Sequence, residues 1–535
     1  MAAETKPLII TFGGGINARK RALDIDVQEC RAGENFALDP LRNAFNRRAA
    51  FDLKATTPNA ASILGYAQLR TKAGVITTLI QSGTNVYSWD GDTTFALVGT
   101  VSSTSVKLRG GLDQNFTLDD YTIITDLSKT DPVKMWDGTT FQNFTHNLGG
   151  TFIAKYCRVF GERSWFANVT SGGTSTPHVV LGSKLSDGDN LSTANLPSSA
   201  LGYDQPFYLV MPDLRPINGM EQAFGEFLFS TERGRLWKLS GSSAFDFALA
   251  AFFQGSSVSG NEAIINIGND VLLGLEGRIE SLAGTMDFGD VETNDISTMI
   301  APLIDDVTEW TFGYDQRLQR VYCFPAEQAA CYVLYKSLLY RVQHGFLADD
   351  NQAKLSPWSK FTTEHAMGFQ PQTVMTMINP VTGTDAVYAG DTNGKIYLLE
   401  GDGDQDGGTT DITAYRVSKI LALPPGDVFD VEGWILYAAG FATTLTITFE
   451  YQGIGLFDQA ITIPLSASSS QAAYSGDYYY SGSVYYSAGF NSRLTRRNFA
   501  AAGQADLVQI RCSVSGDEVF DLHEVGIKFR AATAP

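Results

Sequence analysis

The feature that most constrains the fold is a hairpin pattern that occurs twice, in residues 85–95 and in residues 133–141. Each copy consists of a strand pattern that ends in Trp, a tight Asp-Gly turn and a second strand. Asp-Gly between apolar strands favours a hairpin, because Gly adopts a positive φ without strain and Asp tolerates one. Trp89 and Trp136 lie 47 residues apart. This spacing is close to the about 40–50 residues of one β-propeller blade.

Looser copies of the pattern follow along the chain. A Gly turn precedes a polar residue and an apolar strand at residues 234–239, 277–282 and 393–398. We divide residues 56–400 into seven units of short strands, and such radial repetition predicts a β-propeller-like domain over residues 56–405. An array of β-sandwiches is the structural alternative. The range 167–215 interrupts the rhythm with Ser, Thr, Gly, Asp and Pro, so we expect a long polar insertion there.

Residues 406–535 predict a second all-β domain. Alternation in apolar strands such as 444–450 and 507–512 favours a β-sandwich. A loop at 465–492 is rich in Ser, Tyr and Gly, which together form adaptable contact surfaces. We therefore expect a protein contact there, against the alternative of a floppy hairpin with exposed rings. The residues predicted to make this contact are Tyr478, Tyr479, Tyr480, Tyr485 and Tyr486.

Residues 1–55 form a distinct N-terminal arm with nine basic and seven acidic residues in its first 54 positions. A Gly triplet at 13–15 lacks the Lys and the helix of a phosphate-binding loop, so we expect a turn that lets the chain cross a neighbour closely. The basic residues predicted to contact an acidic partner or a neighbouring subunit are Arg19, Lys20, Arg21, Arg47 and Arg48.

The composition limits the classes of function. The net charge of −19 argues against a nucleic-acid wrapper, which needs Lys and Arg for phosphate. Five scattered Cys predict reduced, buried thiols in a protein made in the cytosol. The N-terminus has no signal-peptide pattern, and no apolar run reaches membrane-spanning length.

Catalytic constellations are absent from the sequence. The five His follow no metal-binding spacing, and there is no Gly-x-Ser-x-Gly motif. We therefore expect no enzyme activity and no cofactor. Residues 402–408 begin like a calcium-binding EF-hand loop, but Thr413 replaces the required Glu, so a solvated acidic turn is favoured. The weak cation candidates are Asp402, Asp404 and Asp406.

The N-terminal arm resembles the opening of tail hub and nozzle proteins of short-tailed bacteriophages. The resemblance lies in a Gly-Gly-Ile-Asn segment at 14–17, a Gly-Glu-Asn-Phe-Ala-Leu-Asp segment at 33–39 and the pair Arg47-Arg48. Ala-Ala-Phe at 49–51 replaces the usual end of this pattern. Later segments, such as 387–397, also fit, and the resemblance covers roughly residues 1–400.

This resemblance implies a structural virion protein of a short phage tail. Proteins of this family combine a β-propeller with added β-domains, and six copies form a ring below the head-to-tail adaptor. The ring retains double-stranded DNA and then conducts it without specific binding, with tail fibre or spike proteins and possible host-surface contact nearby. The protein would assemble into virions in the host cytoplasm.

Two other classes of function stay open from the sequence. A carbohydrate-binding or carbohydrate-cleaving propeller could act as a receptor-binding tail protein, because aromatic loops suit sugars as well as proteins. A bacterial propeller scaffold unrelated to phage is the third reading.

Overall fold

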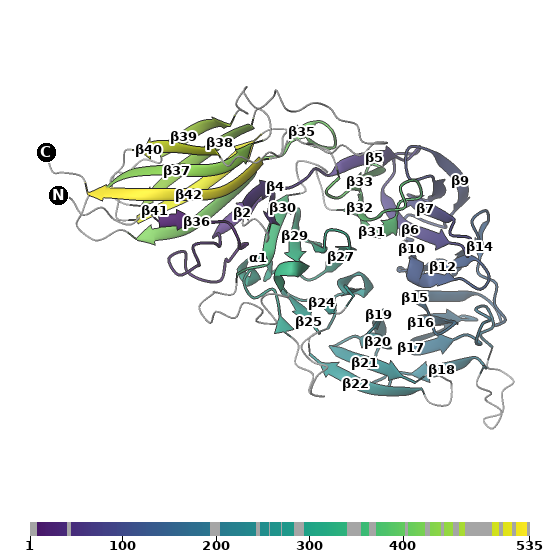
Figure 1. Cartoon of the computed structure of the whole chain (residues 1–535). Helices are drawn as coiled ribbons and strands as arrows, with labels where there is room; N and C mark the ends of the chain where they lie inside the picture. The colour runs from purple at the N-terminus through teal and green to yellow at the C-terminus, as the bar shows by residue number, and fades with distance from the viewer. Residues whose placement is uncertain are drawn as a thin grey trace.

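The computed structural model describes a two-domain, all-β protein, a β-propeller beside a β-sandwich, as the sequence predicts (Figure 1). The described residues are 8–39, 44–192, 204–241, 247–255, 257–268, 270–282, 294–339, 355–362, 371–401, 405–422, 429–439, 443–452, 459–465, 495–501, 507–515 and 520–531. Among them, no helix is long and apolar enough to cross a lipid bilayer.

Seven four-stranded blades form the propeller within these residues. In chain order they are β6 (Ile63–Arg70), β7 (Ile76–Ser82), β8 (Asn85–Trp89) and β9 (Phe95–Thr100); β10 (Leu108–Gly110), β12 (Tyr121–Asp126), β13 (Lys134–Trp136) and β14 (Phe141–Asn143); β15 (Phe152–Phe160), β16 (Arg163–Ser171), β17 (Thr174–Gly182) and β18 (Phe207–Val210); β19 (Ile217–Ala223), β20 (Glu226–Thr231), β21 (Arg235–Ser240) and β22 (Ala248–Gln254); β23 (Ile264–Asn266), β24 (Val271–Leu275), β25 (Arg278–Ser281) and β26 (Asn294–Asp295); β27 (Trp310–Asp315), β28 (Arg320–Pro325), β29 (Ala330–Tyr335) and β30 (Trp358–Thr362); and β31 (Thr373–Ile378), β32 (Asp385–Gly390), β33 (Lys395–Leu398) and β5 (Asp52–Thr56). We number the blades one to seven in this order.

An N-terminal strand closes the ring. β5 pairs antiparallel with β33, so the last blade combines strands from both ends of the propeller sequence. β6 and β10, the first strands of blades one and two, pair in parallel. The Gln68 amide exchanges two hydrogen bonds with the backbone of Ile378, at 2.7 and 2.9 Å, and so ties blade one to blade seven. Radial repetition of the blades leaves only short sheet edges, at the outer strand of each blade.

The two Trp residues of the repeated hairpin pack between blades. Trp89 joins a buried cluster with residues of blade seven such as Tyr388, and Trp136 packs with residues of blade one such as Leu79. Gly91 and Gly138 have φ of 91° and 94°, which explains why Gly follows Asp. The connections are longer than the predicted tight turn, because Asp90 and Asp137 each accept hydrogen bonds from backbone amides two to four residues further on.

The sandwich is built from both ends of the chain. Its first sheet has the order β3 (Phe36–Asp39), β4 (Ala44–Arg47), β42 (Phe520–Ala531), β37 (Phe429–Ala439) and β40 (Thr495–Ala501), with β1 (Leu8–Ile10) also on β42. Its second sheet has the order β2 (Ala32–Glu34), β36 (Ala414–Ala422), β41 (Leu507–Ser515), β38 (Thr443–Gln452) and β39 (Gln459–Leu465). Short elements complete the fold: β11 (Asn115–Phe116), β34 (Gln405–Asp406), β35 (Thr410–Asp411), the 3-10 helices η1 (Leu112–Gln114) and η2 (Asn261–Ala263), and α1 (Ala301–Ile304).

Two expected boundaries are wrong. Residues 1–55 are not a separate arm, because β1–β4 complete the sandwich sheets and β5 belongs to the propeller. The range 167–215 is not an insertion, because its described residues supply β17, β18 and the end of β16, which form most of blade three. The polar residues there lie on outer strands that are partly exposed, where side chains facing solvent need not be apolar.

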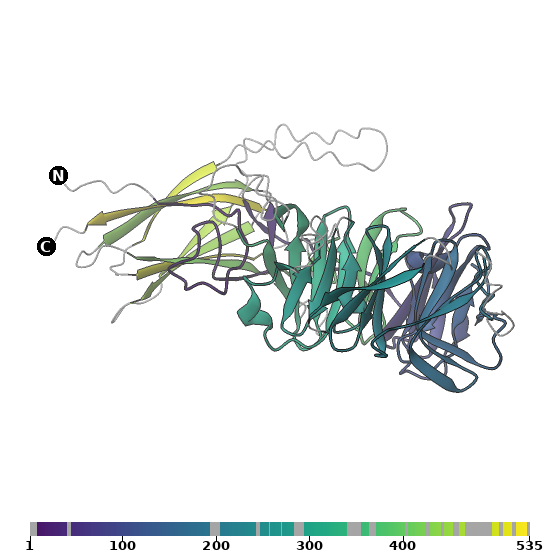
Figure 2. The ribbon, with the colours of Figure 1, turned by 90° about the horizontal axis from the view of Figure 1, so that it is seen from below.

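The sandwich lies at the rim of the propeller, beside blades six and seven, and not on the propeller axis (Figures 1 and 2). One continuous cluster of buried apolar side chains runs from Val525 in the sandwich through Phe12 and Ile16 into blades five and six. The two domains therefore share a core.

Candidate functional site

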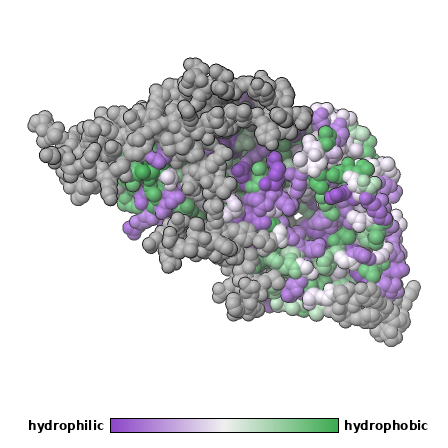
Figure 3. Space-filling model, viewed as in Figure 1, coloured by the Kyte–Doolittle hydropathy of each residue, from purple (hydrophilic) through white to green (hydrophobic). Residues whose placement is uncertain are grey.

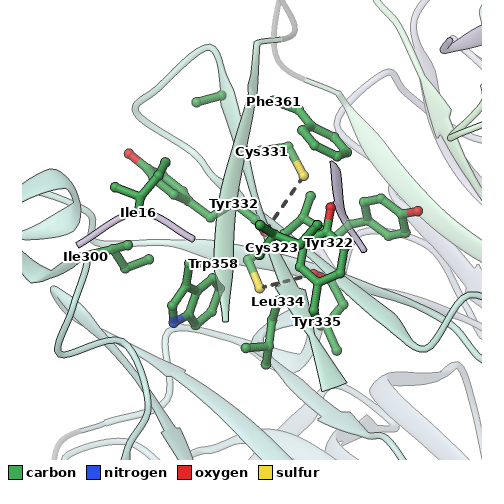
Figure 4. Packing of buried hydrophobic residues seen from close by; sticks show 14 of the residues in the cluster. Ile16, Ile300, Tyr322, Cys323, Cys331, Tyr332, Leu334, Tyr335, Trp358 and Phe361 are labelled. Carbon is green, nitrogen blue, oxygen red and sulfur yellow. Dashed lines mark hydrogen bonds between the residues drawn. The ribbon is translucent and has the colours of Figure 1, made fainter. Parts of the chain in front are cut away.

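The Gly triplet lies where the N-terminal segment crosses β30 of blade six. The Gly15 amide donates to the Ser356 carbonyl at 2.7 Å, and the Ile16 amide donates to the Trp358 carbonyl at 2.9 Å. A Cβ atom on Gly15 would lie only 1.9 Å from the Trp358 carbonyl oxygen. The expected close crossing is therefore confirmed. Figure 4 shows Ile16 beside Trp358 and Ile300 in the apolar core of this crossing.

A buried polar bridge fixes the crossing. The Asn17 amide nitrogen donates to Glu29 Oε2 at 2.8 Å, and the Ser356 backbone amide donates to Glu29 Oε1 at 2.8 Å. Burial raises the pKa of Glu29, although these hydrogen bonds act in the opposite direction. The carboxylate of Glu29 thus holds the N-terminal segment to the loop that leads into β30.

A second bridge is centred on Asn35. Its side chain donates to Thr362 Oγ1 at 2.8 Å and to the Thr413 carbonyl at 3.1 Å, and it accepts from Arg48 Nε at 3.0 Å. Arg48 in turn forms two hydrogen bonds with Asp406, at 2.8 and 2.5 Å, and its guanidinium lies 4.0 Å from the centre of the Phe51 ring. These contacts, together with the Gly15–Ser356 crossing, form a unit that we call the module joint.

Two predicted site assignments are wrong at this joint. Arg47 and Arg48 are 6% and 1% exposed, and Arg48 is paired within the chain, so neither presents a positive charge to a partner. Asp406 is 1% exposed and pairs with Arg48, and its carboxylate accepts a hydrogen bond from the Phe51 backbone amide at 2.9 Å. It is therefore not part of a solvated cation site. The remaining cation candidates, Asp402 and Asp404, lie outside the described residues.

The other predicted basic residues are on the surface. Arg19, Lys20 and Arg21 are exposed, next to exposed Arg31 and to Leu23. Arg31 Nη1 donates to the Ala18 carbonyl at 2.5 Å and thereby orders this turn. We name Arg19, Lys20, Arg21 and Arg31 the basic patch. The predicted tyrosine contacts, Tyr478, Tyr479, Tyr480, Tyr485 and Tyr486, lie outside the described part of the chain.

Charged side chains meet at the propeller axis, a site that the sequence analysis missed. Arg109 of β10, in blade two, donates from Nε to Glu262 of η2, which leads into blade five, at 2.6 Å. Arg109 is 6% exposed and also donates to the carbonyls of Leu64 and Leu108, both at 2.8 Å. Because blades two and five lie across the ring from each other, this ion pair spans the axis.

A second ion cluster joins blades two, three and four. Arg158 of β15 lies 2.6 Å from Asp113 and 3.3 Å from Glu221 of β19. Burial raises the pKa of Glu221 to about 7, although the Arg158 charge opposes that rise. Burial likewise raises the pKa of Tyr66 to about 12, so its phenol stays neutral. Hydrophilic residues surround the middle of the propeller in Figure 3.

Nothing local in the sequence marks this cluster. Arg109, Arg158 and Glu221 come from three different units and meet only when the ring closes. The available signal is a charged residue inside the strand that opens a unit, where an apolar residue is expected. All five Cys are buried free thiols, as predicted. Within the described ranges, no group of three or more His, Cys, Asp or Glu is arranged to hold a metal ion.

Comparisons with known proteins find no matching family model and no matching curated protein. Among solved structures, the chain is similar to the WD40 domain of Toxoplasma gondii coronin, at 10% identity and a TM-score of 0.36, over 70% of this chain and 90% of that one. It is also similar to Kluyveromyces lactis Hsv2, at 10% identity and a TM-score of 0.36, over 67% of this chain and 94% of the other. The computationally designed Ika8 protein matches at 12% identity and a TM-score of 0.33, over 65% of this chain and 99% of its own.

Proposed function

We propose that this chain is a structural protein of a short phage tail, a nozzle or hub subunit, which forms a hexameric ring that retains and then conducts the genome. The observation that carries the proposal is the module joint. Gly15 and Asn35 bond to β30 or to the loop before it, and Asn17 reaches that loop through Glu29. Arg48 adds the buried pair with Asp406, and all four residues lie in the segments that resemble tail hub proteins. A subunit of two rigidly joined domains suits a ring that must keep its shape under internal pressure.

The DNA conduit would lie between subunits. The propeller axis is spanned by the Arg109–Glu262 pair, and its cavities of about 310 and 320 Å³ accept small molecules but not a duplex. The net charge of −19 supports passage of DNA without adhesion, since like charge repels phosphate.

In this proposal the basic patch contacts an acidic surface of the head-to-tail adaptor or of the next subunit. Its charges are exposed in a chain that is otherwise strongly acidic, so they are available to steer assembly. Tail fibre or spike proteins would attach elsewhere on the ring, and contact with the host surface is part of the same proposal. No catalytic step is assigned.

Electron microscopy of the purified protein, alone and with its adaptor, tests the proposal. We expect hexameric rings with an axial channel. Strictly monomeric particles under both conditions would contradict the proposed function.

A variant with Arg19→Glu, Lys20→Glu and Arg21→Glu tests the basic patch within the same assay. Assembly onto heads should be lost while the circular dichroism spectrum is unchanged, because these side chains are exposed. The matched control reverses exposed charges on the propeller, Arg70→Glu with Arg317→Glu, and should assemble normally. Normal tails from the triple variant would exclude this docking role.

A further inference from the structure

Two chambers in the middle of the propeller meet at the axial ion pair. Glu262 lines both chambers, and its partner Arg109 lines one of them. One chamber, of about 320 Å³, includes Lys107, Tyr156 and Trp310 in its wall. The other, of about 310 Å³, is lined from all seven blades, among others by Tyr66, Arg109, Arg158, Glu221, Tyr314 and Asp385. We name the second one the acidic chamber.

The acidic chamber is a polar site built from groups that are already paired. Arg109 is paired with Glu262, and Arg158 lies between Asp113 and Glu221. The strongly buried arginines therefore offer N–H donors beside carboxylate acceptors, without a free positive charge. Asp385 adds a further carboxyl group, whose pKa is raised by burial and by Asp315. Such a wall disfavours anions, because carboxylates outnumber cations.

Hydroxyl groups fit this wall. Each hydroxyl is both a donor and an acceptor, so neighbouring hydroxyls of one ligand can match adjoining arginine and carboxylate groups. Asn266 and Thr376 add neutral amide and hydroxyl groups to the same wall. The side-chain amide of Asn266 donates to the Gln222 carbonyl at 2.7 Å, and the backbone amide of Tyr314 donates to Thr376 Oγ1 at 3.3 Å. These bonds hold the side chains of Asn266 and Thr376 in place.

Aromatic rings supply the apolar part of the wall. Tyr66 lies beside Arg109, whose guanidinium carbon is 5.7 Å from the ring centre, and Tyr314 enters from blade six. Polar groups that converge on a cavity with aromatic surface are the common design of small-molecule sites. The volume of about 310 Å³ suits a ligand of one ring and does not suit a long chain.

We infer that the acidic chamber binds a neutral sugar, as a single hexose unit or the end of a glycan, through hydroxyl contacts to the Arg158–Asp113 and Asp385 groups and apolar contact with Tyr66. This inference is independent of the proposed ring. It gives a defined site to the carbohydrate-binding activity that the sequence leaves open.

Binding is tested on the full purified chain by saturation-transfer NMR and calorimetry. The probes are glucose, galactose and N-acetylglucosamine, with glucuronic acid and N-acetylneuraminic acid as anionic sugars and putrescine as a cation. We expect at least one neutral sugar to bind, with at least tenfold weaker binding of the anionic ones. Absence of binding by every neutral sugar, preference for an anionic sugar, or binding of putrescine alone would each overturn the inference.

Two variants locate the site. Asp113→Ala and Asp385→Ala each remove an acceptor from the acidic chamber, and each should weaken the Kd at least tenfold. Lys107→Ala, in the other chamber, is the matched control and should leave the Kd within twofold. Circular dichroism checks that each variant is folded, and Tyr66→Ala, which removes the ring that the sugar would contact, is the reserve variant if an Asp variant unfolds. Unchanged affinity in the folded acidic-chamber variants would contradict the site.

The sugar-binding result and the ring-assembly result can be told apart. If sugar binding fails while hexameric rings form, only the inference is lost. If the purified protein is a monomer that binds a neutral sugar, the ring proposal is lost and the site stands.

Discussion

Arg48 illustrates how tertiary contacts change the meaning of a charged residue. In the sequence it belongs to an Arg-Arg pair in a basic segment, which favours a surface role. In the fold its guanidinium is enclosed by Asp406, Asn35 and the Phe51 ring. A buried charge is stable only with a partner, and Asp406 is 358 residues away in the sequence.

Loss of this buried pair should strongly destabilise the protein. Arg48→Ala leaves Asp406 buried without its cation, so we expect the free energy of unfolding to fall by about 3–5 kcal/mol. Arg48→Lys should lower the free energy of unfolding by a smaller amount, because Lys keeps the positive charge but cannot reproduce the two parallel hydrogen bonds. Urea denaturation measures the change, with the exposed Arg19→Ala as a control that should shift stability by less than about 0.5 kcal/mol. An Arg48→Ala protein as stable as the parent would show that the pair is not structural.

Glu221, near the propeller axis, makes the stability of the fold depend on pH. Burial raises its pKa from 4.5 to about 7, so between these values the folded protein holds a proton that the unfolded chain has released. The contribution of Glu221 to stability is therefore complete below about pH 4.5 and is lost as pH rises through about 7.

Glu221→Gln should remove this part of the pH dependence, because Gln resembles the protonated acid. We expect the variant to gain stability relative to the parent as pH rises from 5 to 8, measured as the difference in urea midpoint at each pH. Glu232→Gln, at an exposed position, should show no such trend. A constant difference between parent and Glu221→Gln across this range would contradict the assignment.

At the scale of elements, the N-terminal segment and β30 form the contact on which the two-domain arrangement depends. The segment passes so close to β30 that only Gly fits at position 15. The neighbouring contacts, from Ile16 in the core to Lys360 paired with Glu34 at 2.8 Å, continue along the same strand. The Gly-Gly-Ile-Asn segment thus has a steric and hydrogen-bonding explanation in this fold.

Gly15→Ala should loosen this crossing. The added methyl group would overlap the Trp358 carbonyl, and relief requires the backbones to separate, so we expect a loss of about 1–3 kcal/mol or more. Hydrogen exchange at the Ile16 amide, which is bonded to that carbonyl, should accelerate more than exchange in blades one to three. Gly149→Ala is the matched control, because a Cβ atom added there would have no neighbouring atom within 4 Å. Equal behaviour of the two variants would refute the steric argument.

For the whole molecule, charge is distributed unevenly. The chain carries −19 overall, yet Arg19, Lys20 and Arg21 lie on one exposed turn between the two domains. The Arg31 side chain joins them through its hydrogen bond to the Ala18 carbonyl. Interactions between exposed charges are screened over about 8–10 Å at moderate salt. Assembly through this surface should therefore respond to ionic strength.

If the proposed tail function holds, assembly with the adaptor should weaken at least tenfold between 50 and 500 mM NaCl, while the triple Glu variant of the basic patch shows no further loss. Analytical ultracentrifugation over a salt series measures both. A salt-independent association constant for the parent protein would place the docking contact on a different, apolar surface. The Arg70→Glu, Arg317→Glu control should follow the parent.

Local signals in the sequence determined the all-β class, the propeller period, the sandwich and the close crossing at Gly15, because turn chemistry and strand alternation act over a few residues. The same reasoning misplaced the domain boundaries, because nothing local shows that β1–β4 pair with strands from the other end of the chain.

Only the tertiary structure decided which charges are free and which are paired. Arg48 meets Asp406, and Arg109 meets Glu262 across the axis, through separations of 358 and 153 residues. Whether a charged side chain is available to a partner depends on the groups that surround it after folding, and ring closure and the return of the C-terminal strands bring those groups together. The hairpins of the sequence therefore fix the blades, while the joint and the axial chambers exist only in the folded chain.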